Sequence, residues 1–208
     1  MHAKKFIKFI KFILIGLISL TIISTTAIFA GCNDNANGGT FIIELYPEYA
    51  PQTVDNFVKL TEEGFFDGLT FHRIVDGFMA QGGGYDANGV KKEAQTIFGE
   101  FANNGYTQNT LKHTKGVVSM ARIGGMNDSA SSEFFIMYGD APLLDGDYAA
   151  FGKVIEGMDV VEKFLTVERT MGFDGDLSSP VNPVIIKKMT VDNSGDNPKI
   201  KVEMGAIK

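Results

Sequence analysis

The sequence predicts a mainly β domain, closed into a barrel or stacked as a sandwich, that follows an export signal. Glycine is abundant, with 24 residues in 208, and turn signals recur at short intervals, which favours short strands over long helices. Most apolar runs are short and rich in β-branched and aromatic residues, as strands are. About 175 residues remain after residues 1–31, enough for one domain with a sizeable core.

The expected elements follow from the pattern along the chain. The run TFIIELY at residues 40–46 predicts the first strand. A helix comes next, because Pro51 stands at its start, apolar residues recur at helical spacing up to Leu60, and Gly64 follows its last turn. A second, shorter helix is predicted over residues 158–164. Further strands are expected at residues 70–75, 78–81, 117–120, 134–137, 149–154 and 183–191. Antiparallel strands in this number can close into a barrel, which removes exposed edges.

Residues 193–208 follow the last of these strands. They form either a loose tail or, at residues 199–204, a further strand, and the sequence leaves both open. We expect the folded domain at residues 40–192, with the C-terminal segment as a tail. A flexible tether is predicted at residues 32–39, because after its first residue it holds no apolar side chain larger than alanine.

Residues 1–31 have the features of an export signal. Four lysines precede an uncharged apolar stretch at residues 12–30, and FAGC follows at residues 29–32. Cys32 is the only cysteine in the chain, so it cannot form an internal disulfide. The segment resembles a bacterial lipoprotein signal, in which the cysteine is lipidated and becomes the first mature residue. Phe29 departs from the leucine that is usual three positions before that cysteine.

Two other interpretations of this segment stay open. The apolar run is long enough to span a bilayer, so an uncleaved membrane helix is an alternative anchor. A buried or reactive thiol at Cys32 has little support in so polar a neighbourhood. Several acyl chains on Cys32 would anchor the protein stably. Either anchor leaves the domain attached to the cell membrane on the extracytoplasmic side.

The charge of the chain excludes one class of partner. Removing the four lysines of residues 1–31 from the 19 basic residues leaves 15 against 25 acidic ones, a formal charge of about −10. Binding of nucleic acid depends on basic patches that neutralise phosphates. We therefore expect no nucleic-acid partner.

Residues 71–83, which read FHRIVDGFMAQGG, are the most informative run in the chain. One cation, Arg73, and one amide, Gln81, lie among large apolar side chains, which is the composition of an apolar cleft with a single positive donor. Such a cleft suits rotation about a peptide bond before proline, whose barrier comes from amide resonance. The twisted imide nitrogen gains a lone pair that accepts a hydrogen bond, and a guanidinium is a permanently charged, rigid donor for it.

This run and five further blocks resemble the cyclophilin family of peptidyl-prolyl cis-trans isomerases, in its bacterial type. The further blocks are APQTVDNFVKL (50–60), GEFANNG (99–105), LKHTKGVVSMAR (111–122), SASSEFFIMYG (129–139) and LLDGDYAAFGKVIEGMDVV (143–161). They occur in the order of the family, and the resemblance covers residues 40–192. It implies an eight-stranded antiparallel β-barrel with a helix capping each end.

The resemblance also implies a set of site residues. Arg73 would be the catalytic residue, stabilising the twisted state more than either planar one. Gln81 would orient the arginine or hold the substrate backbone; hydrogen bonding at a sheet edge is its alternative role. Backbone groups of Ala121 and Arg122 would pair with the peptide. The proline pocket would be formed by Phe78, Met79, Phe135 and Leu144.

Three further positions of the substrate-binding site depart from common members of the family. Glu133 replaces a glutamine, and because a carboxylate only accepts hydrogen bonds, we expect it to pair with Arg73 or Arg122. Leu143 replaces a tryptophan and should weaken binding of cyclosporin-like ligands, which lose an indole donor. Tyr148 replaces a histidine and keeps a polar tip on an aromatic body.

The remaining polar residues do not suggest another chemistry. His72 and His113 are expected to be structural hydrogen-bonding partners, because neither has the spacing of a zinc ligand. The glycine-rich run at residues 82–89 lacks the ending of a phosphate loop, and no G-x-S-x-G motif supports serine hydrolysis. Asp145 and Asp147 are interpreted as solvated turn charges.

These observations predict a monomeric, membrane-anchored isomerase that acts on Xaa-Pro bonds of exported proteins and assists their folding. It would need no cofactor and no metal. The main alternative is a proline-peptide binding module or chaperone with little catalysis, in which Glu133 neutralises Arg73. A further alternative is a surface lipoprotein whose barrel is only a scaffold.

Overall fold

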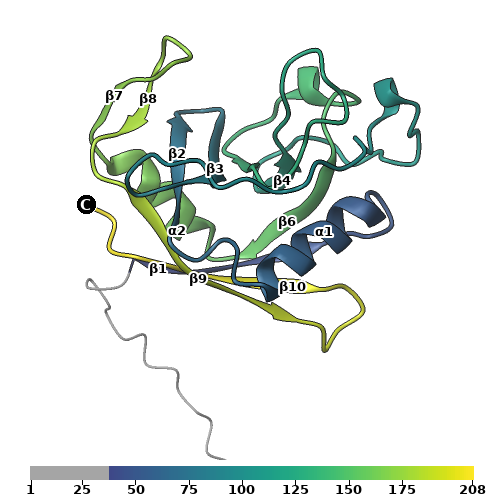
Figure 1. Cartoon of the computed structure of the whole chain (residues 1–208), viewed down its shortest axis with the longest axis horizontal. Coiled ribbons are helices and arrows are strands. Elements are labelled where there is room, and N and C mark those ends of the chain that lie inside the picture. The colour runs from purple at the N-terminus through teal and green to yellow at the C-terminus, as the bar shows by residue number, and fades with distance from the viewer. Residues whose placement is uncertain (1–37) are drawn as a thin grey trace, which may run out of the picture. The chain divides into compact units, whose positions relative to one another are not determined.

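The computed structural model describes residues 38–208, and Figure 1 shows their arrangement. The predicted signal, Cys32 and most of the predicted tether lie outside the described residues. In the described part, eight strands form a closed antiparallel barrel in the order β1-β10-β9-β2-β3-β5-β4-β6. Two helices accompany the barrel. The predicted fold class is therefore confirmed.

The elements agree closely with the strands and helices expected from the sequence. The barrel strands are β1 (Gly39–Leu45), β2 (Leu69–Val75), β3 (Met79–Asp86), β4 (Val117–Met120), β5 (Phe134–Met137), β6 (Ala150–Glu156), β9 (Val184–Asp192) and β10 (Lys199–Met204). The helices are α1 (Pro51–Glu62) and α2 (Met158–Glu162), and α2 continues into a 3-10 turn at Lys163–Thr166. Further 3-10 turns lie at Ala102–Asn104 and Pro142–Leu144. A separate hairpin consists of β7 (Arg169–Met171) and β8 (Leu177–Pro180).

The C-terminal segment is part of the barrel. β10 pairs with β1 on one side and with β9 on the other, and Ile200, Val202 and Met204 are buried. Without β10, both neighbouring strands would present unpaired edges. The predicted end of the domain at residue 192 is therefore wrong. That boundary followed the last strand covered by the family resemblance, whereas hydrogen bonding extends the domain through residue 204.

Aromatic side chains fill the barrel and attach α1 to it. The Phe57 ring of α1 is fully buried and lies 4.9 Å from the Phe66 ring, 5.1 Å from the Phe134 ring and 5.0 Å from the Phe151 ring, measured between centroids. Tilted and edge-on contacts of this kind add about 0.5–1.5 kcal/mol each beyond the buried area. The apolar face that predicted the helix thus becomes the face that fixes it to the barrel.

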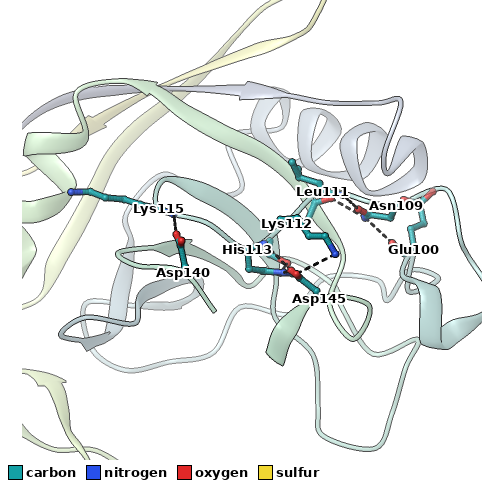
Figure 2. Close-up of polar contacts among 10 residues, drawn as sticks. Glu100, Asn109, Leu111, Lys112, His113, Lys115, Asp140 and Asp145 are labelled. Atoms are coloured by element: carbon teal, nitrogen blue, oxygen red, sulfur yellow. Dashed lines mark hydrogen bonds and ion pairs between the residues drawn. The ribbon is translucent and has the colours of Figure 1, made fainter. Parts of the chain in front are cut away.

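The N-terminus of α1 is held by a carboxylate from a distant loop. Ala50 at the N-cap offers no side-chain acceptor. Instead the buried Glu100 accepts the backbone N–H of Gln52 at 3.0 Å and that of Thr53 at 2.8 Å, and the Thr53 hydroxyl donates to it at 2.7 Å. A negative charge at a helix N-terminus is favourable. The Glu100 carbonyl in turn accepts the side-chain amide of Asn109 at 2.9 Å (Figure 2).

We expect Glu100→Gln to lower the free energy of unfolding by about 1–3 kcal/mol, because one carboxylate oxygen that accepts two hydrogen bonds becomes an amide that cannot. Chemical denaturation measures this loss. Glu93→Gln is the matched control: the Glu93 side chain is 78% exposed and lies 3.9 Å from Lys91, so its loss should change the free energy by less than about 0.5 kcal/mol. Equal effects of the two substitutions would contradict the capping role.

Candidate active site

A second apolar cluster lies apart from the main core. Its buried members are Met79, Val117, Phe135, Met137 and Ala150, and the side chains packed against them are Val75, Phe78, Leu111, Ala121, Ala141, Leu144 and Tyr148. β3 and β5 form its centre, because Met79 pairs with Met137 and Gln81 with Phe135 across the two strands. All four residues predicted to form the proline pocket belong to this cluster, as do Ala121 and Tyr148.

Arg73 lies at the edge of this apolar cluster. It pairs with Gln81 across β2 and β3. Its Nη1 is 3.7 Å from the Met79 sulfur, and its Nε donates to Oδ2 of Asp174 at 2.5 Å. The Arg73 side chain is 28% exposed and that of Asp174 20%. The guanidinium therefore stands between the apolar cluster and the β7–β8 hairpin, with one edge toward each.

Glu133 has partners other than those expected from the sequence. Its Oε2 accepts the Gln81 side-chain amide at 2.9 Å and lies 3.5 Å from Nε2 of His72. The expected pairing with Arg73 or Arg122 is therefore not the one observed, because Asp174 occupies the free edge of Arg73 and Arg122 points to a backbone carbonyl. Gln81, expected to orient Arg73, donates to Glu133 instead.

His72 is a neutral partner in this group. Burial lowers the pKa of His72, and the nearby Glu133 carboxylate opposes this only in part. Within residues 38–208, Nδ1 of His72 is buried without a hydrogen-bonding partner. The ring also packs edge-on against Tyr85 at 4.7 Å. These contacts agree with a structural role for His72.

Arg122 fixes the loop that carries Tyr148. Its Nε donates to the Asp147 carbonyl at 2.9 Å. The guanidinium lies 4.8 Å from the Tyr148 ring centroid and 5.2 Å from that of Phe101. Such cation–π contacts contribute about 0.5–1 kcal/mol at exposed sites. Arg122 therefore holds Tyr148 against the cluster with its side chain.

Two other predicted site residues take peripheral positions. The Ala121 N–H donates to the Glu133 carbonyl at 2.9 Å, so of its backbone groups only the carbonyl could pair with a peptide. Leu143 is 92% exposed and stands beside the cluster rather than inside it. A side chain in this position contacts a ligand only at the rim of the site.

His113 supports the cluster from behind. Its Nδ1 is 3.0 Å from Oδ1 of Asp145, and its Nε2 is 3.0 Å from the Ser119 hydroxyl (Figure 2 shows the side of Asp145). The His113 ring stacks on Phe135 at 6.0 Å and meets Tyr148 edge-on at 6.5 Å. The predicted structural role of His113 fits these contacts.

Asp145 was missed by the sequence analysis. Its side chain is only 17% exposed. Besides its contact with the His113 ring, Oδ1 accepts the His113 backbone N–H at 2.9 Å. The interpretation of Asp145 as a solvated charge is therefore wrong, because the chain turns its carboxylate back onto a histidine 32 residues away. Burial raises the pKa of Asp145, but its hydrogen bonds from His113 and Lys112 outweigh this and lower it overall.

Ser119, His113 and Asp145 have the distances of a catalytic triad but not its accessibility. The His113 side chain is fully buried, and Ser119 has no exposed surface. A nucleophile must reach a substrate carbonyl, and this hydroxyl cannot. The three residues connect β4 to the loop before Tyr148 and so position the walls of the cluster.

A cleft of about 570 Å³ opens beside Arg73. Arg73, Gln81 and Glu133 line one side, and Phe173 and Asp174 of the β7–β8 hairpin line another. Arg73 therefore contributes to both the cleft and the apolar cluster. An extended chain bound across Arg73 would contact both.

The described residues contain neither a candidate metal site nor a candidate membrane-spanning helix. Within residues 38–208, no group of three or more His, Cys, Asp or Glu side chains is arranged to hold a metal ion. No helix in this range is both long enough and apolar enough to cross a bilayer.

The closed barrel and the arginine beside an apolar cluster define a peptide-binding barrel of the kind that the family resemblance implies. Comparison with known proteins supports this class. The family model described as cyclophilin type peptidyl-prolyl cis-trans isomerase/CLD matches residues 33–191. The chain therefore belongs to the cyclophilin-type peptidyl-prolyl cis-trans isomerases, and the predicted enzyme class is confirmed.

Individual relatives agree with the family. The chain is 44% identical over 123 residues to peptidyl-prolyl cis-trans isomerase B of Bacillus subtilis, covering 59% of this chain and 81% of that protein. It is 36% identical over 155 residues to peptidyl-prolyl cis-trans isomerase-like 2 of Gibberella zeae, covering 74% of this chain but only a quarter of that longer protein. A Cryptosporidium parvum cyclophilin-type isomerase, crystallised in the presence of the dipeptide Ala-Pro, matches with a TM-score of 0.58 and 27% identity, over 72% of this chain and 96% of that one.

The buried His113 predicts a loss of stability in mild acid. Burial lowers the pKa of His113 below its ordinary value of about 6.5. The unfolded chain therefore binds a proton that the folded chain does not, and the free energy of unfolding should fall as the pH drops below about 6.5. His72, whose pKa is also lowered by burial, acts in the same direction.

His113→Asn should make this pH dependence shallower between about pH 7 and pH 5, because one of the contributing groups is gone. Denaturant unfolding at several pH values measures the slope separately from the cost of the substitution itself. His72→Asn is the comparison, since it should leave the contribution of His113 to the pH dependence unchanged. A slope in His113→Asn equal to that of the unsubstituted chain would contradict the assignment.

Proposed function

We propose that this chain accelerates cis-trans isomerisation of Xaa-Pro bonds, and that it is an exported protein of bacterial type that assists folding at the membrane surface. The observation that carries the isomerase function is Arg73, a permanent cation held against an apolar cluster formed by Met79 and Phe135. Membership of the isomerase family supports the same reaction.

The geometry suggests how the reaction is accelerated. A proline ring would lie on the apolar cluster, among Phe78, Met79, Phe135 and Leu144. Nη1 of Arg73 lies at this cluster, 3.7 Å from the Met79 sulfur. From there a guanidinium N–H can donate to the imide nitrogen when the bond twists out of conjugation. Because that lone pair accepts only in the twisted state, the hydrogen bond stabilises the transition state selectively.

The reaction needs nothing more than binding and this hydrogen bond. The uncatalysed barrier of about 18–20 kcal/mol comes from amide resonance alone. No bond is made or broken, so no nucleophile, metal or acid–base pair is required. We infer that short proline-containing segments of unfolded proteins are the substrates. The Cryptosporidium parvum relative crystallised in the presence of Ala-Pro supports this class of substrate.

The location of the protein is a proposal from its first 32 residues. Four lysines, an uncharged apolar stretch at residues 12–30 and the single Cys32 support export followed by anchoring. A domain anchored outside the membrane would meet chains that have just been exported, when slow proline steps leave apolar segments exposed. We propose that it acts there as a monomer.

A second candidate function is supported by one contact. Asp174 pairs with Arg73, and a carboxylate that consumed the donors of the arginine would leave a proline-peptide binding module with little catalysis. An exchange measurement by NMR on an Ala-Pro peptide separates the two functions. Binding without acceleration over buffer supports the module, and acceleration supports the isomerase.

We expect Arg73→Ala to lower kcat/KM for such a peptide by about 100-fold or more, as loss of a transition-state donor does. The circular dichroism spectrum should stay that of the unsubstituted chain, because the Arg73 side chain is partly exposed and is not a member of the main core. Lys201→Ala is the control, since it removes a 49% exposed cation on β10 and should not change turnover. Unchanged turnover in Arg73→Ala would remove this residue from the mechanism.

The lipid anchor is tested separately from the activity. Cells that express the full chain and are fed a radioactive fatty acid should label it, because the Cys32 thiol is the proposed attachment point. Cys32→Ala should remove the label. Label retained in Cys32→Ala would exclude Cys32 as the site, and an unlabelled, uncleaved chain would favour the signal-anchor alternative.

A further inference from the structure

The β7–β8 hairpin is attached to the strand that carries Arg73. β8 packs beside β2, as Figure 1 shows at the end of the barrel. Arg169, at the start of β7, donates through Nη1 to the Ile74 carbonyl and through Nη2 to the Leu165 carbonyl, both at 3.3 Å. The hairpin is therefore fixed to the backbone next to Arg73 by its own base. None of the family motifs found in the sequence lies in this hairpin.

The turn of the hairpin holds the Asp174 carboxylate in one orientation. Its Oδ1 accepts the Ser178 hydroxyl at 2.8 Å and the Asp176 backbone N–H at 3.1 Å. Ser178 is buried. Gly175 has a φ of +81°, which favours glycine and allows the chain to reverse directly after Asp174. These contacts occupy Oδ1 and leave Oδ2 directed at Arg73.

The contact between Asp174 and Arg73 uses one edge of the guanidinium. Oδ2 accepts from Nε at 2.5 Å, while Nη1 lies toward the Met79 sulfur. A guanidinium has five N–H donors; Nε–H is given to Asp174 and one Nη1 N–H to the Met79 sulfur, which leaves three Nη donors for a substrate. Among the described residues, Asp174 is the one oxygen acceptor that the Arg73 side chain has.

We propose that Asp174 is a positioning residue for Arg73, a carboxylate on the hairpin that sets the direction in which the guanidinium donates. The inference rests on the proposed isomerase function. A long, partly exposed arginine side chain samples many rotamers, and it loses that freedom when it donates in one direction. An acceptor fixed by Ser178 restricts it before substrate binds, and an error of about 1 Å in such a group can cost about 100-fold in rate.

The ionisation of Asp174 supports this assignment. Partial burial acts to raise the pKa of Asp174, but hydrogen bonds from Arg73, the Asp176 N–H and Ser178 outweigh it and hold this pKa at about 2. The carboxylate is therefore charged at every pH at which the enzyme would work. It can act as a permanent acceptor for Nε.

The test is substitution in the full chain with an Ala-Pro peptide as substrate. Asp174→Asn should lower kcat by about 10- to 100-fold with KM within about twofold, since the apolar contacts with proline are untouched. Ser178→Ala should lower kcat less and in the same direction, because it only loosens the carboxylate. Asp176→Asn is the matched control: it removes the same charge from the same turn, keeps the backbone N–H, and should leave kcat unchanged.

A second readout reports the contact itself. The sequence holds three arginines, Arg73, Arg122 and Arg169, so the NMR spectrum has at most three side-chain Nε–H signals to assign. We expect a slowly exchanging Arg73 signal, assigned through its absence in Arg73→Lys, that is lost in Asp174→Asn and kept in Asp176→Asn. A change confined to folding would not remove this one signal while leaving those of Arg122 and Arg169.

The outcomes separate the inference from the function on which it rests. If the unsubstituted chain does not accelerate exchange, the proposed isomerase function fails. If it does, and Asp174→Asn keeps or raises kcat, the positioning role is overturned while the isomerase function stands. A raised kcat would mean that Asp174 lowers turnover in the unsubstituted chain. A fall that appears equally in Asp176→Asn would also overturn the inference.

Discussion

The arrangement of the site depends on keeping a single cation at an apolar surface in a fixed direction. A guanidinium that contacts the Met79 sulfur and is only partly exposed loses part of its hydration, and a partly desolvated charge is stable only with a good partner. Asp174 supplies that partner from outside the barrel, at the Nε edge. Glu133 pairs with neither arginine and instead accepts from Gln81 and approaches His72. The polar side chains around the cleft therefore form two separate sets, Arg73 with Asp174 and Glu133 with Gln81 and His72.

Buried polar side chains, rather than apolar ones alone, hold the loops that surround this site. Glu100 caps α1 and receives Asn109 through its carbonyl, and His113 joins Asp145 to Ser119 beneath the Phe135 ring. Buried groups with complete sets of partners rigidify the segments that they join. The loop between β3 and β4 forms no long strand of its own, and these contacts are among those that hold it. Figure 2 shows the part of the two networks that joins Glu100 to Asn109 and His113 to Asp145.

Local residue patterns and family motifs predicted most of the strands and the apolar cluster. Contacts between residues far apart in the sequence could not be predicted. Alternation and turn residues placed the strands, and the family resemblance placed Phe78, Met79, Phe135 and Leu144 in one cluster. At residues 199–204 the sequence left a tail and a strand as alternatives. Six residues of moderate β propensity do not show that they pair with β1 and β9 to complete the barrel. Asp174 is 101 residues from Arg73 and lies in a turn, where an aspartate is ordinary. Asp145 was missed for the same reason, and the partner of Glu133 was wrong because Asp174 was not foreseen. In each case a carboxylate gained its role only when the folded chain brought a donor to it.

A carboxylate paired with Arg73 is compatible with the proposed catalysis because of the kind of reaction involved. Rotation about a prolyl bond creates no net charge; it turns a conjugated nitrogen into a neutral acceptor. The strength of a hydrogen bond to such an acceptor depends on distance and angle, so a fixed direction matters more than the long-range field of the cation. For a reaction that develops an anion, neutralising the arginine would weaken electrostatic stabilisation of the transition state. Pairing with Asp174 weakens the long-range electrostatic field of Arg73, which this reaction does not need. It also fixes the direction in which the guanidinium donates, which the reaction does need, provided that the Nη donors stay on the substrate side. The contact through Nε alone meets that condition.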